Sequence, residues 1–525
     1  MPLTTISQPL ASAPQLAWTI YASFLGAVAV LLTPSSRPQF TRWVALLTSV
    51  VGFVLTLGAV LQYQPGSLLL VADSTWIPQL GIRYTLAADG ISLTLLLLTG
   101  LAAMAGILFS WNIEHRTREF FAFYLVLIGG VYGVFLSFDL FLLFVFYEIA
   151  IIPKYFLIAI WGSAPNGDTR PRQYAAMKLA LYSFAGSALV LIGILAAWAA
   201  SGSHTLNLAV LAHYPFSQHF QMWAFPLIFV GFAVLAGLWP FHTWAPTGHA
   251  AAPTAASMLL AGVVMKLGAY GCLRVAMMLF PLGLAPWGFH ILGLGSWRDV
   301  FALLALISIV YGASVALVQR DFKFVIGYSS VSHMGFVLLG LMTLSQIGIN
   351  GAVLQMFSHG IIAGLLFAVV GRMVYDRTHT RDLAALGPMQ LSYALPFAAV
   401  TFTLAAMASV GLPGFSGFIA ELQVILGVWR SMPWMVFAVA LGILIGVAFT
   451  WRALTRVFFP ASQSDESPAP IEHPLPPITL PERAGALLLL TATIIVGLYP
   501  HILMRLILPS LQSPLFSALR NGGWR

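Results

Sequence analysis

Apolar stretches long enough to cross a membrane follow one another along most of the chain. A helix that spans the hydrocarbon core of a bilayer needs about 20 mostly apolar residues. Fourteen stretches meet this requirement, so the pattern predicts an all-α polytopic membrane protein. The expected transmembrane helices cover residues 16–33, 42–62, 90–111, 119–137, 139–162, 174–200, 223–246, 254–280, 301–319, 323–343, 347–375, 391–429, 434–457 and 483–508.

Two of the stretches contain prolines that argue against a single straight helix. The twelfth is too long for one span and carries Leu412-Pro413-Gly414 near its middle, and the seventh has Pro240 and Pro246 around a short Phe-His-Thr-Trp segment. Non-helical backbone is tolerated at membrane depth only where protein or a water-filled cavity satisfies its polar groups. We therefore predict two discontinuous helices, each the fourth helix of a five-helix stretch. Matched breaks of this kind indicate two inverted five-helix repeats.

The repeats set the predicted organisation of the chain. The first three helices occupy 1–118, the first repeat 119–280 and the second repeat 301–457. An extramembrane linker rich in proline, serine and acidic residues covers 458–482, and we expect it to cap one face without a core of its own. A C-terminal helix and tail occupy 483–525. The other long connections are predicted as loops, at 63–89, 201–222 and 281–300.

The composition supports a membrane protein and excludes soluble classes. Only 8% of the residues are charged and 59% are hydrophobic, with a mean hydropathy of +0.91, whereas about a quarter of a soluble domain is charged. The net charge of +8 does not indicate nucleic-acid binding, because the basic residues lie in short loops. Fourteen of them follow odd-numbered spans, and seven, Arg274 among them, lie on the opposite side. The positive-inside rule then places both termini outside the cytoplasm.

No sequence feature indicates a redox or metal centre in this chain. The single cysteine, Cys272, lies within an apolar stretch and cannot form an intrachain disulfide. Neither the cysteine nor the histidines have the spacing of metal or iron–sulfur ligands. No glycine-rich nucleotide loop is present. We expect no metal ligand and no cofactor-binding residue.

Lysine is rare and confined to the apolar stretches. Of the 24 basic residues only four are lysines, all inside or at the ends of predicted spans: Lys154, Lys178, Lys266 and Lys323. A buried lysine can release its proton near neutral pH, whereas arginine effectively cannot. The pattern favours a role in proton transfer, with chance or codon bias as the alternative.

Two carboxylates and four histidines also fall within spans or at the breaks. Glu148 and Glu421 lie deep in apolar stretches, where a charge costs at least a few kcal/mol and marks a functional site by default. The alternative is a buried glutamate that fixes helix packing. Asp139, at a span boundary, is predicted as a helix N-cap.

The histidines are suited to a hydrated proton relay, because imidazole accepts and donates protons near neutral pH. Packing is the alternative role for each one. No ring of oxygen ligands for sodium accompanies them, so glutamate, lysine and histidine together indicate proton movement. The four are His242, His249, His333 and His359.

Several strings, taken together, resemble the antiporter-like membrane subunits of respiratory complex I, and among these subunit M, also named chain 4 or D. They are WPFHTWAPTGHAAAPTAASMLLAGVVMKLGAYG, VALVQRDFKFVIGYSSVSHMGFVLLG, VGRMVYDRTHTRDLAALG and ASVGLPGFSGFIAE. The resemblance runs over roughly 90–455. It implies a fourteen-helix fold with two inverted five-helix repeats and a central hydrated axis of charged residues. It also implies that quinone reduction elsewhere in the complex drives proton transfer through the subunit.

The resemblance assigns roles to particular residues. Glu148 matches a fifth-helix glutamate that gates a lysine partner, Lys266 the connecting eighth-helix lysine, and Glu421 the exit-side glutamate of the twelfth helix. The four histidines match residues of the axis or its surroundings. Partners implied are the L- and N-type antiporter-like subunits and the lipid bilayer, with quinone, NAD, FMN and iron–sulfur clusters bound in other subunits. The membrane implied is the bacterial plasma membrane, or alternatively the thylakoid.

The sequence departs from the family at the seventh helix. Relatives have a lysine five residues before Pro240, where this chain has Leu235, and the usual aspartate of their Pro-Asp-Ala-His is Thr247. A leucine cannot carry a proton. Lys154 lies on the same predicted helix as Glu148, at a position commonly apolar in the family, and we hypothesise that it supplies the lost ammonium. The alternative is that Lys154 extends to the membrane edge.

Three functions stay open. The first is a proton-translocating subunit of an NADH- or ferredoxin-fed quinone oxidoreductase, which makes the chain part of an enzyme without a redox centre of its own. The second is a structural paralogue in the membrane arm that has lost pumping, which Leu235 and Thr247 favour. The third is a subunit of a cation/proton antiporter or of a membrane-bound hydrogenase.

Overall fold

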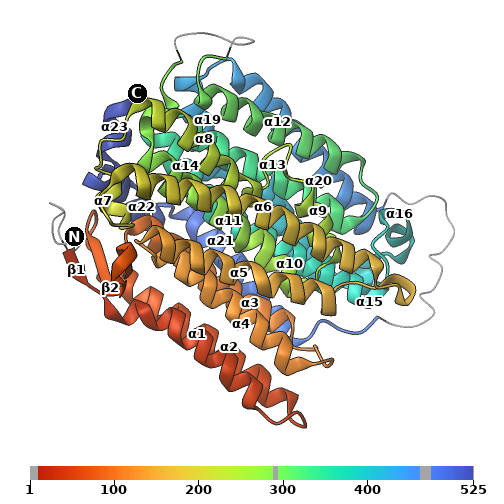
Figure 1. Cartoon of the computed structure of the whole chain (residues 1–525). Helices are drawn as coiled ribbons and strands as arrows, with labels where there is room; N and C mark the ends of the chain where they lie inside the picture. Colours follow the sequence, from red (N-terminus) through yellow and green to blue (C-terminus); the bar gives the residue numbers. More distant parts are fainter. Residues whose placement is uncertain (1–9, 288–293, 461–474, 524–525) are drawn as a thin grey trace.

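The chain forms a bundle of long helices with a small β-sheet at one end (Figure 1). The computed structural model describes residues 10–287, 294–460 and 475–523. The longer helices are α1 (Ala17–Leu32), α2 (Pro38–Gln62), α3 (Gly90–Phe109), α4 (Thr117–Leu136), α5 (Leu140–Trp161), α6 (Arg170–Ser201), α8 (Gln218–Ala236), α12 (Trp297–Val318), α13 (Phe322–Met342), α14 (Gln346–Phe367), α18 (Pro396–Ser409), α19 (Ser416–Ser431), α20 (Met435–Val457), α21 (Leu480–Leu498) and α22 (His501–Gln512). The shorter ones are α7 (Leu208–Leu211), α9 (Trp244–Ala251), α10 (Thr254–Leu259), α11 (Met265–Gly271), α15 (Asp376–Thr378), α16 (Leu383–Leu386), α17 (Leu391–Ala394) and α23 (Ser517–Gly523).

The predicted all-α polytopic class is confirmed. In the described part of the chain, 13 helices are long and apolar enough to cross a membrane, and a bent pair, His501–Gln512 with Pro514–Asn521, brings the number to 14 by the same test. Helix starts follow from local sequence. Asp139 Oδ1, for example, accepts hydrogen bonds from the backbone N–H groups of Phe141 and Leu142 at 3.0 and 3.1 Å. These bonds cap α5 as predicted and satisfy donors that have no partner within the helix.

Both predicted helix breaks are confirmed. The first lies between the end of α8 at Ala236 and the start of α9 at Trp244, and the second between the end of α18 at Ser409 and the start of α19 at Ser416. The second break needs a glycine at its start. Gly411 has a φ of +72°, and a Cβ there would lie 2.8 Å from Glu421 Oε2. The inverted symmetry of the two five-helix stretches stays a prediction.

One sequence prediction near the C-terminal end of the chain is wrong. The stretch 483–508 is not one helix, because α21 ends at Leu498 and α22 begins at His501. Pro500 explains the interruption, since proline lacks the N–H that a continuing helix needs and disfavours helical backbone in the residue before it. The linker predicted at 458–482 lies largely outside the described residues.

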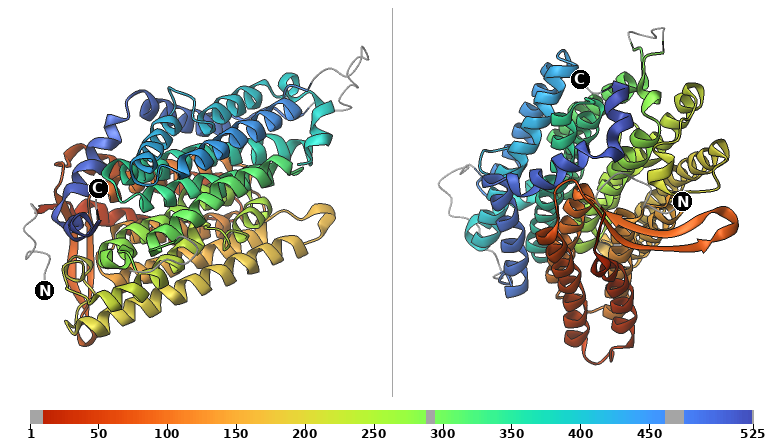
Figure 2. Two further views of the ribbon diagram at one scale, coloured as in Figure 1. Left: turned by 90° about the horizontal axis from the view of Figure 1, so that it is seen from above. Right: turned by 90° about the vertical axis from the view of Figure 1, so that its left-hand side faces the viewer.

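The region 63–89, predicted as a loop, contains a β-hairpin. Strand β2 (Leu68–Ile77) pairs antiparallel with β3 (Ile82–Ala88), and β1 (Leu10–Ser12) adds to β2 in parallel, giving the order β1-β2-β3. In the antiparallel register Leu69 is paired with Ala88 and Ile77 with Ile82. The hairpin extends sideways from the bundle (Figure 2).

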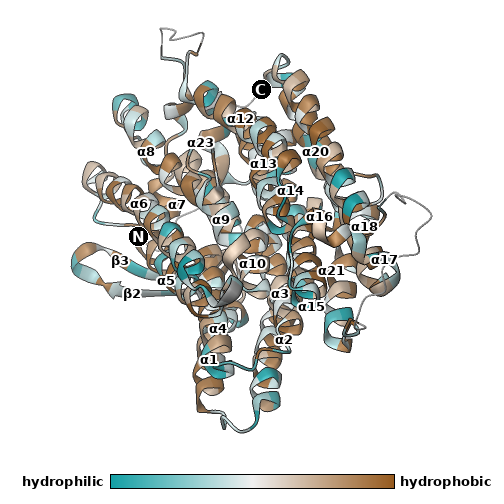
Figure 3. Ribbon diagram, turned by 90° about the vertical axis from the view of Figure 1, so that its right-hand side faces the viewer, coloured by the Kyte–Doolittle hydropathy of each residue, from teal (hydrophilic) through white to brown (hydrophobic). Residues whose placement is uncertain are grey.

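The helices that carry the candidate charges lie at the centre of the bundle. The helical runs Gly90–Phe109, Thr254–Met277 and Gln346–Thr378 are almost wholly buried, whereas only a minority of the residues of α2 and α20 are buried. Hydrophobic residues cover much of the length of the outer helices (Figure 3). Apolar side chains thus face the position of the lipid, and polar groups are enclosed by protein.

The two ends of the bundle differ in charge. The β-sheet and α23 lie at one end, and α15 and α16 lie at the other (Figures 1 and 2). We name the second end the basic end, because Arg320, Arg377 and Arg381 gather there around the turns that connect α12 with α13 and α14 with α17.

Candidate functional site

Lys266 lies at the centre of the bundle, on α11. Helical turns of the wide π type flank this helix, at Leu260–Val264 and Cys272–Met277. The Lys266 side chain is fully buried, and its ammonium donates to the backbone carbonyl of Ala261 in the first of these turns. Its Nζ also lies 2.8 Å from His359 Nδ1 on α14. The sequence required a partner from another helix for this lysine, and the partner is an imidazole.

Two histidines and a glutamate extend from this lysine toward α19. The ring centroids of His359 and His333 are 5.3 Å apart, and His333 Nδ1 lies 3.2 Å from Glu421 Oε1. The amide of Gln355 donates to the same carboxylate oxygen at 3.3 Å. We name Lys266, His359, His333 and Glu421 the connected cluster, because residues up to 155 positions apart in the sequence lie next to one another in one row, although His359 Nε2 has no hydrogen-bond partner among the described residues.

Glu148 and Lys154, both on α5, form a separate pair. Their charges act on each other. Lys154 is 1% exposed, so its ammonium does not lie at the surface of the described chain. Neither Lys154 Nζ nor Glu148 Oε1 has a hydrogen-bond partner among the described residues. Pro153 lies inside α5, which continues as one helix through it.

Leu235 occupies the last turn of α8, directly before the first break, and is 1% exposed. The ionisable side chain of α8, His219, lies at the opposite end of that helix. Across the break, Lys178 on α6 places its Nζ 3.5 Å from Thr247 Oγ1, the second position at which the sequence departs from the family. Lys178 therefore lies beside the altered motif, although the sequence assigned it no specific role.

His242 and His249 lie on either side of the start of α9, and both are buried. In the described part of the chain, none of their four ring nitrogens has a hydrogen-bond partner. His242 packs against the ring of Tyr311, with centroids 5.2 Å apart, and the charge of Lys178 acts on it. His249 packs against Phe367 at 5.0 Å. The charges of both Lys266 and Lys323 act on His249.

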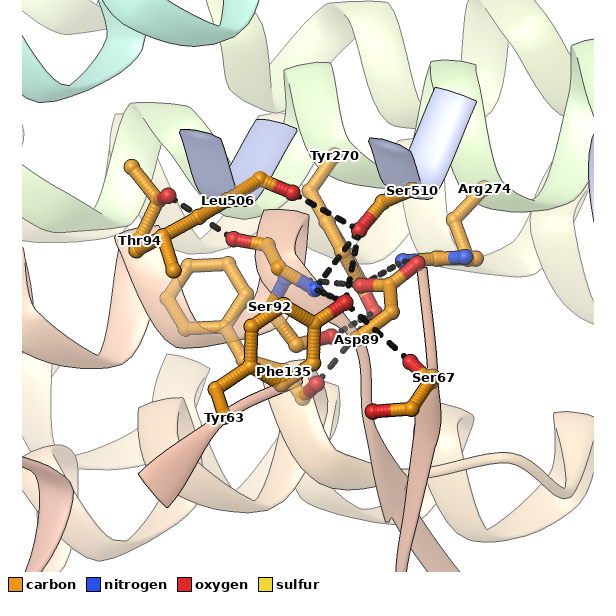
Figure 4. A network of polar contacts seen from close by, with 11 residues as sticks. Tyr63, Ser67, Asp89, Ser92, Thr94, Phe135, Tyr270, Arg274, Leu506 and Ser510 are labelled. Atoms are coloured by element: carbon orange, nitrogen blue, oxygen red, sulfur yellow. Dashed lines mark hydrogen bonds and ion pairs between the residues drawn. The ribbon is translucent and has the colours of Figure 1, made fainter. Parts of the chain in front are cut away.

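A second buried network joins the end of α2 and the start of α3 to α22 and to the turn that carries Arg274 (Figure 4). Arg274 Nη2 lies 2.7 Å from both carboxylate oxygens of Asp89, and both side chains are almost fully buried. Asp89 also caps α3 through the N–H of Ser92. The count of loop charges included Arg274, and that placement is wrong, because Arg274 lies inside the π-type turn Cys272–Met277.

The network reaches the C-terminal helix through the first residue of α3. Gly90 N–H donates to Ser510 Oγ at 2.8 Å and to the Tyr63 hydroxyl at 3.1 Å. A Cβ on Gly90 would collide with the carbonyl of Leu506, so glycine permits the close approach of α22. Burial, with the nearby charge of Asp89, raises the pKa of Tyr63 to about 12, which keeps its hydroxyl protonated as a donor.

The described residues contain no group of three or more histidine, cysteine, aspartate or glutamate side chains that could hold a metal ion. What the central residues can do is exchange protons. The connected cluster consists of an amine, two imidazoles and a carboxylate in a row, and each of these groups can both accept and donate a proton.

The helical fold with its two broken helices is similar to that of antiporter-like membrane subunits. Residues 137–446 match the family model described as NADH:quinone oxidoreductase/Mrp antiporter, TM. The chain belongs to this family.

Two curated relatives and one solved structure illustrate the similarity. The chain is 36% identical over 504 residues to NADH-quinone oxidoreductase subunit M of Rhodobacter capsulatus, covering 93% of each protein. It is 37% identical over 499 residues to an NAD(P)H-quinone oxidoreductase chain 4 of Synechococcus sp. (strain JA-3-3Ab), covering 93% of this chain and 90% of that one. In the solved structures, a chain of respiratory complex I from Thermus thermophilus with bound NADH superposes with a TM-score of 0.84 at 26% identity. The match covers 96% of this chain and 99% of that one.

Proposed function

We propose that this chain moves protons across the membrane as a subunit of an NADH- or ferredoxin-fed quinone oxidoreductase. The observation that carries the proposal is the connected cluster. A buried lysine, two histidines and a glutamate form one line from the centre of the bundle to the second helix break. Each charge buried in a membrane is costly, and a purely structural role would be served by fewer ionisable groups.

Proton transfer along the cluster follows from its atoms. The charged Lys266 ammonium has donors only, so in that state it donates to a deprotonated His359 Nδ1. Transfer leaves a neutral amine and an imidazolium, whose other nitrogen passes a proton toward the adjacent ring of His333. His333 Nδ1 then protonates the Glu421 carboxylate, 3.2 Å away. Each step moves one charge, which changes the proton affinity of the next group and allows coupling between sites.

Energy for this transfer would come from other subunits. The names of the relatives support a quinone oxidoreductase as the host complex. In that setting NAD, FMN, iron–sulfur clusters and quinone bind in other subunits, and L- and N-type subunits adjoin this chain. We place the chain in a bacterial plasma membrane or a thylakoid, with both termini outside the cytoplasm and the basic end inside.

Lys154 supplies, in this proposal, the ammonium that Leu235 cannot. Its burial, its lack of a hydrogen-bond partner among the described residues and its electrostatic interaction with Glu148 support that role. Lys154 is six residues from Glu148, about 240° around a straight helix, so the two do not stack on one face. A proton would pass from this pair to Lys266 through water, because buried polar groups without protein partners are commonly hydrated.

A non-pumping structural paralogue is the second candidate. Leu235 favours it, because the described side chains provide no direct link from the Glu148 pair to the connected cluster. The connected cluster itself is complete, however, and a subunit that has lost pumping has no use for it. An antiporter or hydrogenase subunit would use the same cluster with different neighbours.

The test uses the complete complex in sealed vesicles, with protons translocated per electron as the readout. Glu421→Gln removes the carboxylate at the end of the cluster while retaining its size. Glu119→Gln is the control, because Glu119 is half-exposed and pairs only with Arg116. We expect the ratio of protons to electrons to fall in the first variant and to stay at the wild-type value in the second. Equal ratios in all three proteins would overturn the proposal.

A further inference from the structure

We propose that Lys323 takes up protons from a cavity at the basic end and passes them to His249, which makes it a second entry group of the connected cluster besides the Glu148–Lys154 pair. This inference rests on the proposed function. Lys323 is the second residue of α13, and its side chain is 1% exposed. Its Nζ donates to the carbonyl of Ala252, 3.0 Å away, at the C-terminal end of α9.

A cavity of about 150 Å³ lies against this lysine. Ser110, Asn112, Thr254, Tyr375 and Asp376 line it together with Lys323. A single water needs only about 10–15 Å³ of such space, so several water molecules fit. The walls are partly polar, which favours retention of water at the polar positions.

The cavity adjoins a larger pocket at the surface of the basic end. This pocket has a volume of about 530 Å³ and shares Tyr375 with the cavity. Its other polar lining includes Asp321, His379, Arg381 and Asp382. Water therefore has a polar surface to follow from the basic end, past Tyr375, to the Lys323 ammonium.

The inner side of Lys323 faces the first broken helix. The carbonyl that it contacts, on Ala252, is three residues beyond His249, and both Lys323 and Lys266 act electrostatically on the His249 ring. His249 therefore lies on the helix whose C-terminal end Lys323 contacts, and both lysines are close enough to act on its ring electrostatically. Its ring nitrogens have no partner among the described residues and are free to receive a proton.

The charges around Lys323 come from three segments. Arg381 and Lys323 both lie against the Tyr375 ring, and the positive charge of Arg381 disfavours a charged Lys323. The negative charges of Asp376 and Asp321 favour it. Asp321 is itself engaged by Arg381, with Nε and Oδ2 3.0 Å apart. No carboxylate forms an ion pair with Lys323 in the described chain, so the lysine is not held permanently in its charged form by a salt bridge.

The proposed transfer takes two steps, and each step conserves the proton and its charge. A proton from cavity water binds the lone pair of the neutral Lys323 amine. The resulting ammonium then releases a proton, through intervening water, to a lone pair on the His249 ring, and the amine is restored. Arginine at this position would retain its charge and its hydrogen bond to Ala252 but could not release the proton.

This difference between lysine and arginine provides the test. The complete complex carrying Lys323→Arg is compared in vesicles with wild type and with Arg170→Lys. Arg170 is an exposed residue of the basic end that pairs with Asp168. We expect proton translocation to fall at least about tenfold in Lys323→Arg, with wild-type amounts of assembled complex, and to be unchanged in Arg170→Lys.

A structural role for Lys323 predicts the opposite, because arginine preserves the contact with Ala252. Wild-type pumping by Lys323→Arg, with pumping lost in Glu421→Gln, would overturn the entry proposal alone. Wild-type pumping by both variants would instead overturn the proposed function. If Lys323→Arg fails to assemble, Lys323→Ala is assayed with added ethylamine. Recovery of pumping by the amine supports the proposal, and no recovery contradicts it.

Discussion

The two halves of the central axis differ in how their ionisable groups are partnered. In the second half, Lys266 contacts His359 and His333 contacts Glu421 through polar atoms, and the two histidine rings pack together although His359 Nε2 has no hydrogen-bond partner among the described residues. In the first half, Glu148 Oε1, Lys154 Nζ and the ring nitrogens of His242 have no hydrogen-bond partner among the described residues. The boundary between the halves falls at Leu235. In the proposed proton pathway, Leu235 leaves the charged groups on either side of it in place but supplies no ionisable group to connect them.

This difference indicates what each half would need in order to transfer protons. A line of side chains in contact can pass a proton by small rearrangements of its own atoms. Buried groups that lack protein partners need water to connect them, since a buried unsatisfied polar group costs about 1–3 kcal/mol. We therefore expect the first half to depend on hydration and the second half on side-chain chemistry.

The largest effect is expected from removing the centre of the connected cluster. Lys266→Met retains the length of the side chain and abolishes the ammonium that contacts His359. Loss of one proton-transfer group costs about 100-fold or more in rate, so proton translocation and coupled quinone reduction should both fall below detection. The measurement is pumping and turnover in vesicles with matched amounts of complex. Arg170→Met, at an exposed site, serves as the control and should behave as wild type.

A second variant separates the axis from the buried network at the other end of the bundle. Arg274→Leu leaves Asp89 as an unpaired carboxylate in a fully buried site. Breaking such a pair from one side costs about 3–5 kcal/mol. We expect loss of assembled complex, measured by native gel, with normal pumping per electron in any complex that forms. Replacing both partners, as Asp89→Asn with Arg274→Leu, should recover part of the assembly. A lower pumping ratio at full assembly would place the pair in the pathway.

The smallest effect is expected from replacing Lys178, which lies beside the first helix break. Lys178→Met removes an ammonium whose nearest described partner is Thr247 Oγ1, at 3.5 Å. A weak contact of this kind, acting on His242 by charge, supports an effect of about fivefold at most. The measurement is the pumping rate of the variant and of wild type as a function of pH. A loss as large as that of Lys266→Met would show that the first half depends on Lys178 and not on hydration alone.

The sequence was sufficient for the helices and for both breaks. Apolar length determines where helices cross a bilayer, and Pro240 and Pro413 lie inside the observed interruptions. The interruption at Pro500 was missed because apolar residues continue on both sides of it. The hairpin at Leu68–Ala88 was predicted as a loop because its apolar run is too short to cross a membrane, and a short apolar run does not by itself identify a strand.

The sequence identified the residues of the candidate site but not which of them contact one another. Lys266, His359, His333 and Glu421 stood out as ionisable groups in apolar stretches, and the structure brings them together. Their pairing could not be read from one sequence, since His359 is 93 positions from Lys266. The pair Arg274–Asp89 escaped notice because each residue lies at the end of an apolar stretch, where a charge normally faces water. Only tertiary contact shows that both are buried.

The proposed connection between the two halves depends on the role of Lys154. If Lys154 has replaced the lysine lost at position 235, a lysine returned to that position should compensate for its removal. The most direct measurement is protons pumped per electron in vesicles for wild type, Lys154→Ala and Lys154→Ala with Leu235→Lys, at matched assembly. We predict that pumping and coupled turnover fall about fivefold in the single variant and recover in the double variant. Unchanged pumping in Lys154→Ala would contradict this role and favour a membrane-arm subunit that does not use its first half.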